Sequence, residues 1–319
     1  MRSRRFACCA GIAALAAAGL CAAQYPERPV RVILPFAPGG GTDITARLMS
    51  QKLAEAFSQT FIVDNRPGAG SMLGTELAAR ATPDGYTILV VSPEFTVNPS
   101  LQPKVPYDAL RDFAPVMQIT LGQYILAVRT NVQATSVKAL VALAKANPKS
   151  LSYGSSGSGS ANHLGGELFK SMAGIDMVHI PFKGSGPSTN AFLAGDVQVL
   201  FASTTAIIGH VRSGRVRALA VTGPRRSPMA PEIPTVGEEG LPGFEVTGWY
   251  GLLAPVKTPP AIVARLNAEA NRVLPSLKER YAELGSEIVG GTPAAFAEFL
   301  ASDAAKWAKV VKTSGARAD

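Results

Sequence analysis

The chain alternates short β-rich runs with amphipathic helical patterns, and this alternation constrains its fold more than any other feature. In the first series, β-rich runs at residues 30–34, 61–63 and 86–91 are separated by two helical patterns. The apolar faces of those helices carry Ile44, Leu48, Leu53 and Phe57, and then Leu73, Leu77, Ala78 and Ala81. A strand–helix–strand–helix–strand order predicts a parallel sheet with helices on both faces.

Two adjacent extended runs, at residues 116–120 and 124–129, interrupt this rhythm before a second series begins. In the second series, predicted helices at 137–146, 162–172, 188–193 and 206–211 alternate with predicted strands at 151–153, 177–180, 197–201 and 216–221. A Pro- and Gly-rich segment at 224–242 is typical of a connection. The chain ends with a predicted strand at 246–254 and helical patterns at 261–274, 277–284 and 294–311.

The second series is a complete α/β unit inserted within the first, so we expect two lobes. Residues 24–122 and 225–319 would form the first lobe, and residues 123–224 would form the second. The chain would then cross between the lobes twice, near residues 120–125 and within 222–246. Two crossing segments make a hinge, and the cleft between hinged α/β lobes is a natural site for a small ligand.

The first residues have the features of a cleavable secretory leader. Arg2, Arg4 and Arg5 make the start basic, residues 6–20 form an uncharged apolar run, and residues 21–23 supply small residues for cleavage. This pattern predicts a signal peptide over residues 1–23 and a periplasmic mature protein. The apolar run is short and alanine-rich for a membrane anchor. The pattern leaves open whether export follows the general or the twin-arginine route.

All three cysteines, Cys8, Cys9 and Cys21, lie within this leader, so the mature chain would contain none. Disulfides and thiolate metal sites are thereby excluded from the mature protein. The leader also contains three of the 31 basic residues, which leaves 28 against 23 acidic residues and a net charge of +5. These charges are scattered, and no basic stripe indicates a nucleic-acid partner.

Two glycine-rich turns each follow a predicted strand and precede a predicted helix. The first turn, residues 35–43, reads PFAPGGGTD, and the second turn, residues 153–163, reads YGSSGSGSANH. Glycines let backbone approach a ligand closely, and the free N–H groups at a helix start attract anions. Ligands of open α/β sheets bind outside the carboxyl ends of strands, where both turns lie. The two turns therefore predict a protein that holds a carboxylate between its lobes.

Three enzyme motifs fail at identifiable positions near these turns. Ile44 stands where the dinucleotide motif G-x-G-x-x-G needs its third glycine, and no Gly-Lys-Ser/Thr follows to complete a P-loop. Around Ser156, Gly154 fits the hydrolase pattern G-x-S-x-G, but Ser158 replaces the second glycine. Dinucleotide, nucleotide and α/β-hydrolase functions are therefore disfavoured.

The three histidines, His163, His179 and His210, lack the spacing of metal ligands, so we expect them to be structural. His163 is the exception, because it lies just inside the helix after the second turn and is placed to orient that turn. A hydrolase built from Ser156, His163 and a remote acid is an alternative that no spacing supports. We predict no metal site and no cofactor.

Thr42 and Asp43, at the end of the first turn, each allow two interpretations. The carboxylate of Asp43 suits a helix N-terminus, and it equally suits a ligand ammonium or hydroxyl group. Thr42 suits a helix cap and also the presentation of its hydroxyl to the cleft. The sequence leaves these interpretations open for both residues.

Several motifs stand in order along the whole mature chain. They are YPERPV at 25–30, the first turn, NRPGAG at 65–70, PDGYT at 83–87, the second turn, IPFKG at 180–184, RALAVT at 217–222 and GWYG at 248–251. In this order they resemble the Bug family, the extracytoplasmic solute receptors of tripartite tricarboxylate transporters. The resemblance implies an α/β type II periplasmic-binding-protein fold, in which two hinged lobes enclose a ligand cleft.

In the family that the chain resembles, the two turns hold a ligand carboxylate, largely through backbone N–H groups and ordered water. The resemblance implies three sets of ligand contacts. The first turn would contribute Ala37, Gly40, Thr42 and Asp43; the second turn, Ser155, Ser156, Gly159, Ser160 and His163; and the variable end of the ligand would face Ala202 and Thr205.

Three departures from the family pattern bear on the ligand. Ser71 follows Gly70 where many relatives have a second glycine, and Phe182 replaces a common tyrosine and so removes one hydroxyl. Residues 202–205 are neutral where some relatives have an acidic residue. That neutrality weakens the case for a cationic ligand end without excluding one.

The resemblance implies a periplasmic receptor, not an enzyme, that captures a small carboxylate for a tripartite tricarboxylate-type transporter. The carboxylate would be a di- or tricarboxylate, an aromatic acid or an amino acid. The expected partners are inner-membrane permease subunits, and we expect a monomer that binds no nucleic acid. Two alternatives stay open: an orphan periplasmic sensor that feeds a two-component system, and the serine hydrolase described above.

Overall fold

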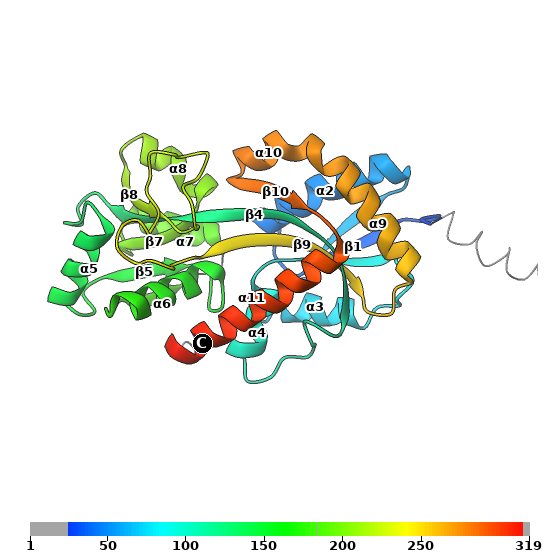
Figure 1. Cartoon of the computed structure of the whole chain (residues 1–319), viewed down its shortest axis with the longest axis horizontal. Coiled ribbons are helices and arrows are strands. Elements are labelled where there is room, and N and C mark those ends of the chain that lie inside the picture. The colour runs from blue at the N-terminus through cyan, green and yellow to red at the C-terminus, as the bar shows by residue number, and fades with distance from the viewer. Residues whose placement is uncertain (1–24, 183, 315–319) are drawn as a thin grey trace, which may run out of the picture.

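The computed structural model describes residues 25–182 and 184–314 (Figure 1). The predicted signal peptide, residues 1–23, lies outside the described residues. Within them, no helix is long and apolar enough to cross a membrane.

Strands and helices follow one another in the order that the sequence predicts, with a few additions. The strands are β1 (Val30–Leu34), β2 (Phe61–Asn65), β3 (Thr87–Val91), β4 (Phe113–Arg129), β5 (Ser152–Ser155), β6 (Val178–Pro181), β7 (Val199–Ser203), β8 (Val216–Val221), β9 (Thr247–Pro255) and β10 (Ser286–Gly290). The helices are α2 (Gly41–Phe57), α3 (Met72–Ala79), α4 (Glu94–Leu101), α5 (Val137–Ala146), α6 (Ala161–Ala173), α7 (Ser185–Ala194), α8 (Thr204–Arg212), α9 (Pro260–Val273), α10 (Lys278–Glu283) and α11 (Pro293–Ser314), with a 3₁₀ turn η2 (Leu274–Leu277) before α10.

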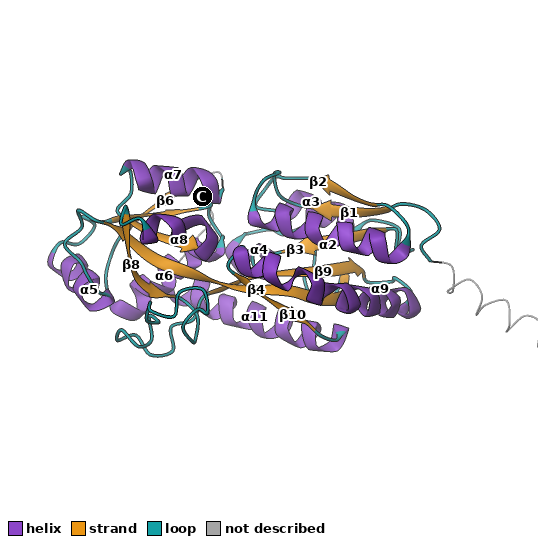
Figure 2. Ribbon diagram, turned by 90° about the horizontal axis from the view of Figure 1, so that it is seen from above, coloured by secondary structure: helices purple, strands orange, loops and turns teal. Residues whose placement is uncertain are grey.

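The strands join in the order β2-β1-β3-β9-β4-β7-β5-β6, and β10 and β8 also pair with β4. β1 is parallel to β2 and β3, as the alternation predicts, and β5 is parallel to β6 and β7. β9 is antiparallel to both β3 and β4. Helices lie on both sides of the strands in each half of the molecule (Figure 2). The predicted mixed α/β class is confirmed.

β4 is one continuous strand of 17 residues, whereas the sequence predicted two separate runs. Its first part pairs with β9 and β10, and its second part pairs with β7 and β8. The two predicted runs left residues 121–123 between them. Pairing with β9 nevertheless continues through Gly122 and Gln123. Figure 1 shows β4 and β9 running side by side from one half of the molecule to the other.

Two short elements, α4 and β10, were not predicted from the sequence. α4 has eight residues and contains Pro99, and its Thr, Val and Asn residues are weak helix formers. β10 has five residues and borders only β4, so it has no long apolar signature of its own. Local propensity is too weak in both segments to predict them, and tertiary packing decides their conformation.

The connecting segment 225–246 packs with the second series rather than with the first. Val236, Phe244 and Val246 share one buried cluster with Phe169 of α6 and Phe201 of β7. α11 packs with both series: Phe296 joins a cluster of the first, and Trp307 joins a cluster of the second. We therefore propose that the second lobe extends to Val246, and that α11 bridges the two lobes.

The hydroxyl of Thr222 ties together the two chain segments that connect the halves of the sheet. It accepts from the backbone N–H of Tyr124 at 2.9 Å and donates to the backbone carbonyl of Val246 at 2.6 Å. The backbone of Thr222 is also paired with both of these residues. The Thr222 side chain is fully buried, so each lost bond would strand a polar group away from water.

We expect Thr222→Val to destabilise the protein by about 1–3 kcal/mol, because a buried N–H and a buried carbonyl lose their side-chain partner. Urea unfolding of both proteins measures the difference. Thr222→Ser retains the hydroxyl and serves as the matched control, with a smaller loss. Equal stability of the valine variant and the wild type would contradict this account of the connection.

Candidate functional site

The first turn leaves β1 at the carboxyl end of the parallel strands and enters α2. Gly40 is the N-cap residue of α2, and Gly39 adopts φ +90°, a left-handed conformation that favours glycine. The backbone N–H groups of Gly40, Gly41 and Thr42 have no hydrogen-bond partner within residues 25–182 and 184–314. Ala37 and Gly41 are exposed, so the turn is open to solvent. Unpaired donors at a helix N-terminus form an anion site.

Asp43 uses both carboxylate oxygens to hold the first turn in shape. Oδ2 accepts from the backbone N–H of Gly39 and from Nε of Arg47, each at 3.0 Å, and Oδ1 accepts from Nδ2 of Asn65 at 2.9 Å. Burial alone would raise the pKa of Asp43, but these hydrogen bonds outweigh it and hold the pKa below its ordinary value. Of the two interpretations of Asp43, the contacts favour the organisation of the helix start.

The sequence analysis assigned no role to Arg47 or Asn65, although both build the first turn. Asn65 ends β2 and also donates to the backbone carbonyl of Phe36 at 3.0 Å. Arg47 lies one helical turn beyond Asp43, a spacing that favours an ion pair. That spacing was readable from the sequence, whereas the contact with Asn65 depends on the pairing of β1 with β2.

Tyr250 of β9 lies against the start of α2. A methyl group at Gly41 would come within 2.6 Å of Tyr250 Oη, so the close approach requires glycine at this position. Burial raises the pKa of the Tyr250 phenol to about 12; the charge of Glu94 adds to this shift, and a hydrogen bond from Thr42 opposes it. The hydroxyl of Thr42 is thus directed to Tyr250.

The second turn connects β5 to α6 and bonds extensively with itself. Asn162 Oδ1 accepts from the backbone N–H of Ser156 at 3.2 Å and from its hydroxyl at 3.0 Å. The N–H of Gly157 donates to Ser155 Oγ at 3.1 Å, and the hydroxyl of Ser160 donates to the carbonyl of Gly157 at 2.5 Å. The second turn therefore has fewer unused donors than the first.

Two histidines hold this second turn. His163 Nδ1 accepts from the backbone N–H of Gly159 at 3.0 Å, which fulfils the expectation that His163 orients the turn. The ring of His163 stacks on that of His179, with 4.0 Å between centroids. His179 Nε2 lies 2.6 Å from Ser155 Oγ. From the sequence, only a structural role was predicted for His179. Its contact with Ser155 depends on the pairing of β5 with β6, which no local pattern reveals.

The hydrolase alternative depends on a bond between Ser156 and His163. The Ser156 hydroxyl donates to Asn162 instead, and His163 Nδ1 is occupied by the N–H of Gly159. The serine closest to a histidine nitrogen in these contacts is Ser155, which is fully buried. This arrangement does not resemble a general base poised beside an exposed nucleophile.

The C-terminal end of α4 lies close to the second turn. A methyl group at Gly159 would come within 2.7 Å of Leu101 at the end of α4. Asn98, also on α4, donates to the carbonyl of Gly70 at 2.8 Å and so ties in the loop before α3. Glu94, the first residue of α4, acts electrostatically on Tyr250 beside the first turn. The structure thus brings both predicted turns to one short helix that the sequence analysis missed.

The charge of Glu94 acts on three tyrosines, Tyr107, Tyr124 and Tyr250. Burial raises the pKa of Tyr107 to about 12 and raises that of Tyr124 well above its ordinary value, and the charge of Glu94 contributes to both shifts. Burial also raises the pKa of Glu94 itself, against hydrogen bonds from Ser92 and from its own backbone. Since no sequence motif singles out Glu94, only the fold reveals this cluster.

The remaining predicted contacts lie elsewhere. The side chain of Ala202 is buried in an apolar cluster with Ile125, Ile207 and Val221, so it faces the core. Its neighbour Ser203 is partly exposed and pairs with Tyr124 across the strands. The side chain of Thr205 lies outside the described part of the structure.

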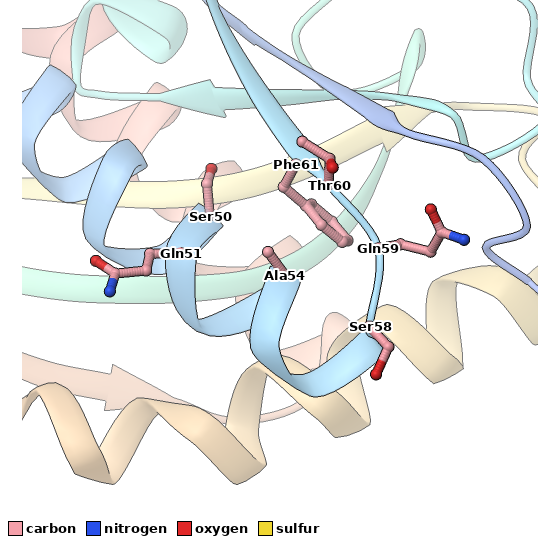
Figure 3. A pocket seen from close by; sticks show the side chains of 7 residues that line it. All are labelled: Ser50, Gln51, Ala54, Ser58, Gln59, Thr60 and Phe61. Carbon is pink, nitrogen blue, oxygen red and sulfur yellow. The ribbon is translucent and has the colours of Figure 1, made fainter.

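A hollow of about 390 Å³ lies where α2 ends and β2 begins (Figure 3). It is lined by Ser50, Gln51, Ala54, Ser58, Gln59, Thr60 and Phe61. Since it lies at the opposite end of α2 from the first turn, we do not assign it to the site. The described residues contain no group of three or more histidine, cysteine or acidic side chains placed to bind a metal.

The chain is similar to a family of transport receptors and to several solved structures. The model of the tripartite tricarboxylate transporter family receptor matches residues 45–316. The structure of Rpa4515 from R. palustris with adipate superimposes with a TM-score of 0.86 at 34% identity, covering 92% of this chain and all of that one. The periplasmic binding protein BugD gives a TM-score of 0.83 at 34% identity, with the same coverage. MatC from Rhodopseudomonas palustris with bound malate gives 0.82 at 31% identity, covering 90% of this chain and all of that one.

We expect Asp43→Asn to destabilise the protein by about 1–3 kcal/mol at pH 7, because an amide NH₂ cannot accept from Gly39 and Arg47. The pKa of Asp43 is lowered by folding, so its stabilisation is present above the ordinary pKa and disappears as pH falls through the folded value. The difference between wild type and variant should therefore shrink in acid.

Urea unfolding at pH 7 and near pH 3 tests this expectation. Asp196→Asn, at an exposed position on the loop after α7, is the matched control and should change stability by less than about 0.5 kcal/mol. A stability difference for Asp43→Asn that does not vary with pH would show that the carboxylate charge is not what holds the turn.

Proposed function

We propose a function for this chain from the family to which it belongs, the receptors of the tripartite tricarboxylate transporter family. The protein is a solute-binding receptor that captures a small carboxylate between its two lobes and passes it to permease subunits in the membrane. The observation that carries this proposal is the set of unpaired N–H groups at Gly40, Gly41 and Thr42. Solved relatives with adipate and malate bound support a carboxylate ligand.

The first turn is the primary carboxylate site in this proposal. Its free donors and the dipole of the 17-residue helix α2 attract a carboxylate without a cationic side chain. The second turn contributes the partly exposed Ser156, whose hydroxyl would exchange its bond to Asn162 for one to the ligand. Of the predicted contacts, Asp43, Ser160 and His163 shape the turns, and Ala37, Gly40 and Ser156 are the residues placed to touch the ligand.

Closure of the two lobes would couple binding to delivery. β4 and β9 connect the two halves of the sheet. A ligand that contacts both turns binds the closed arrangement more tightly than the open one, and this difference in affinity shifts the population toward closure. The periplasm is the proposed compartment, on the basis of the leader over residues 1–23 and of the periplasmic relative BugD. A receptor role requires no bond to be made or broken, in keeping with the family.

Carboxylates should raise the melting temperature of the purified protein. A ligand present at 100 times its dissociation constant adds about 2.7 kcal/mol of stability. A thermal-shift panel of di- and tricarboxylates, aromatic acids and amino acids measures this effect. The diamides of adipate and malate lack the carboxylate and are matched controls that should give no shift. If no carboxylate stabilises the protein, the proposed function is wrong.

Gly41→Ala should weaken carboxylate binding by about tenfold or more, because the new methyl group displaces either the turn or Tyr250 and misaligns the donors. Gly209→Ala on α8 adds the same methyl group where nothing lies within 4 Å, and it should leave affinity unchanged. Gly41→Ala combined with Tyr250→Phe removes the obstructing oxygen and should recover part of the loss. Unchanged affinity in Gly41→Ala, measured by calorimetry, would contradict the assignment of the first turn.

A further inference from the structure

The acidic side chain of Glu94 lies near the first turn, and it has no cationic partner among the described residues. Oε2 accepts from the hydroxyl of Ser92 at 2.5 Å, and Ser92 itself is buried. Apart from the backbone N–H of Glu94 itself, no other group on residues 25–182 and 184–314 is hydrogen-bonded to this carboxyl. The residue as a whole is partly exposed.

Glu94 also lies close to the groups proposed to bind the ligand. β1 and β3 are adjacent parallel strands, so the first turn and the start of α4 leave the sheet side by side. The Tyr250 phenol lies against Gly41, and the negative charge of Glu94 contributes to the raised pKa of this phenol. The far end of α4 packs against Gly159 of the second turn. Glu94 therefore stands on a helix that begins beside the first turn and ends close to the second.

The surroundings of Glu94 favour a positively charged neighbour. The negative charge of Glu94 contributes to the raised pKa of Tyr107, Tyr124 and Tyr250, and burial raises the pKa of Glu94 itself. A buried acidic group is stabilised by an opposite charge at short range, and the described chain supplies none. A ligand cation would fill that role. A second ligand carboxylate would instead place two negative charges together.

We propose that Glu94 recognises the end of the ligand that lies away from the clamped carboxylate, and that this end bears an ammonium group. The ligand is then an amino acid in the broad sense, a carboxylate that carries a protonated amine, and not a simple dicarboxylate. The inference rests on the proposed function and narrows it. It also differs from the relatives described with adipate and malate, whose ligands bear two carboxylates.

Calorimetry on the purified protein with chain-matched ligands tests the inference. The dicarboxylates are succinate, glutarate and adipate, and their partners are γ-aminobutyrate, δ-aminovalerate and ε-aminocaproate; aspartate and glutamate complete the panel. We expect the tightest ligand to carry an ammonium group. Glu94→Gln should weaken that ligand about 10- to 100-fold, the usual range for a hydrogen bond to a charged group, and leave dicarboxylates unchanged or tighter.

Glu279→Gln removes the same charge from the exposed face of α10 and is the matched control; it should alter no affinity. The inference is overturned if the tightest ligand is a dicarboxylate, above all one whose binding takes up a proton at pH 7. It is also overturned if Glu94→Gln binds every ligand as the wild type does. Both outcomes are compatible with the proposed receptor function. If no carboxylate in the panel binds, the proposed function and the inference about Glu94 are both wrong.

Discussion

The pairing of β4 with β9 is the constraint on which the rest of the structure depends. β4 passes through both halves of the sheet, and β9 accompanies it from Thr247 to Pro255. Because the two strands join the halves, they set the position of the second turn relative to the first. The buried hydroxyl of Thr222 secures the point at which β4, the end of β8 and the return to β9 meet. Tyr124 and Tyr250, on which the charge of Glu94 acts, belong to these same strands.

The two glycine-rich turns differ in what they offer to a ligand. Backbone donors of the first turn are free because Asp43 takes up only the N–H of Gly39 and leaves the following groups unpaired. In the second turn, Asn162, Ser155 and His163 accept from the backbone, and the hydroxyls of Ser156 and Ser160 donate within the turn as well. The N-terminus of α2 attracts an anion, whereas the turn before α6 forms a wall of the site that carries hydroxyl groups. In the proposed function, this asymmetry makes the first turn the stronger anchor.

Much of the fold was predictable because its signals are local. The parallel core, the insertion and both turns follow from apolar periodicity and from glycine at strand ends. The differences also have local causes: β4 was predicted as two adjacent runs, and α4 and β10 are too short and too weak in propensity to stand out. Of the candidate site, His163 was predicted in its orienting role, whereas the interpretation of Asp43 needed its three hydrogen-bond donors to be seen.

The sequence by itself determined the class of the fold, the two turns and the resemblance to a receptor family, since each depends on residues close together in the chain. Tertiary structure decided which atoms of those turns are free and which side chains surround them. Asn65 reaches Asp43 across paired strands, and His179 reaches Ser155 in the same way. The charge of Glu94 acts on Tyr124 and Tyr250, which belong to the distant strands β4 and β9, only because the chain folds. Contacts between distant segments carry no local pattern, so only packing reveals them.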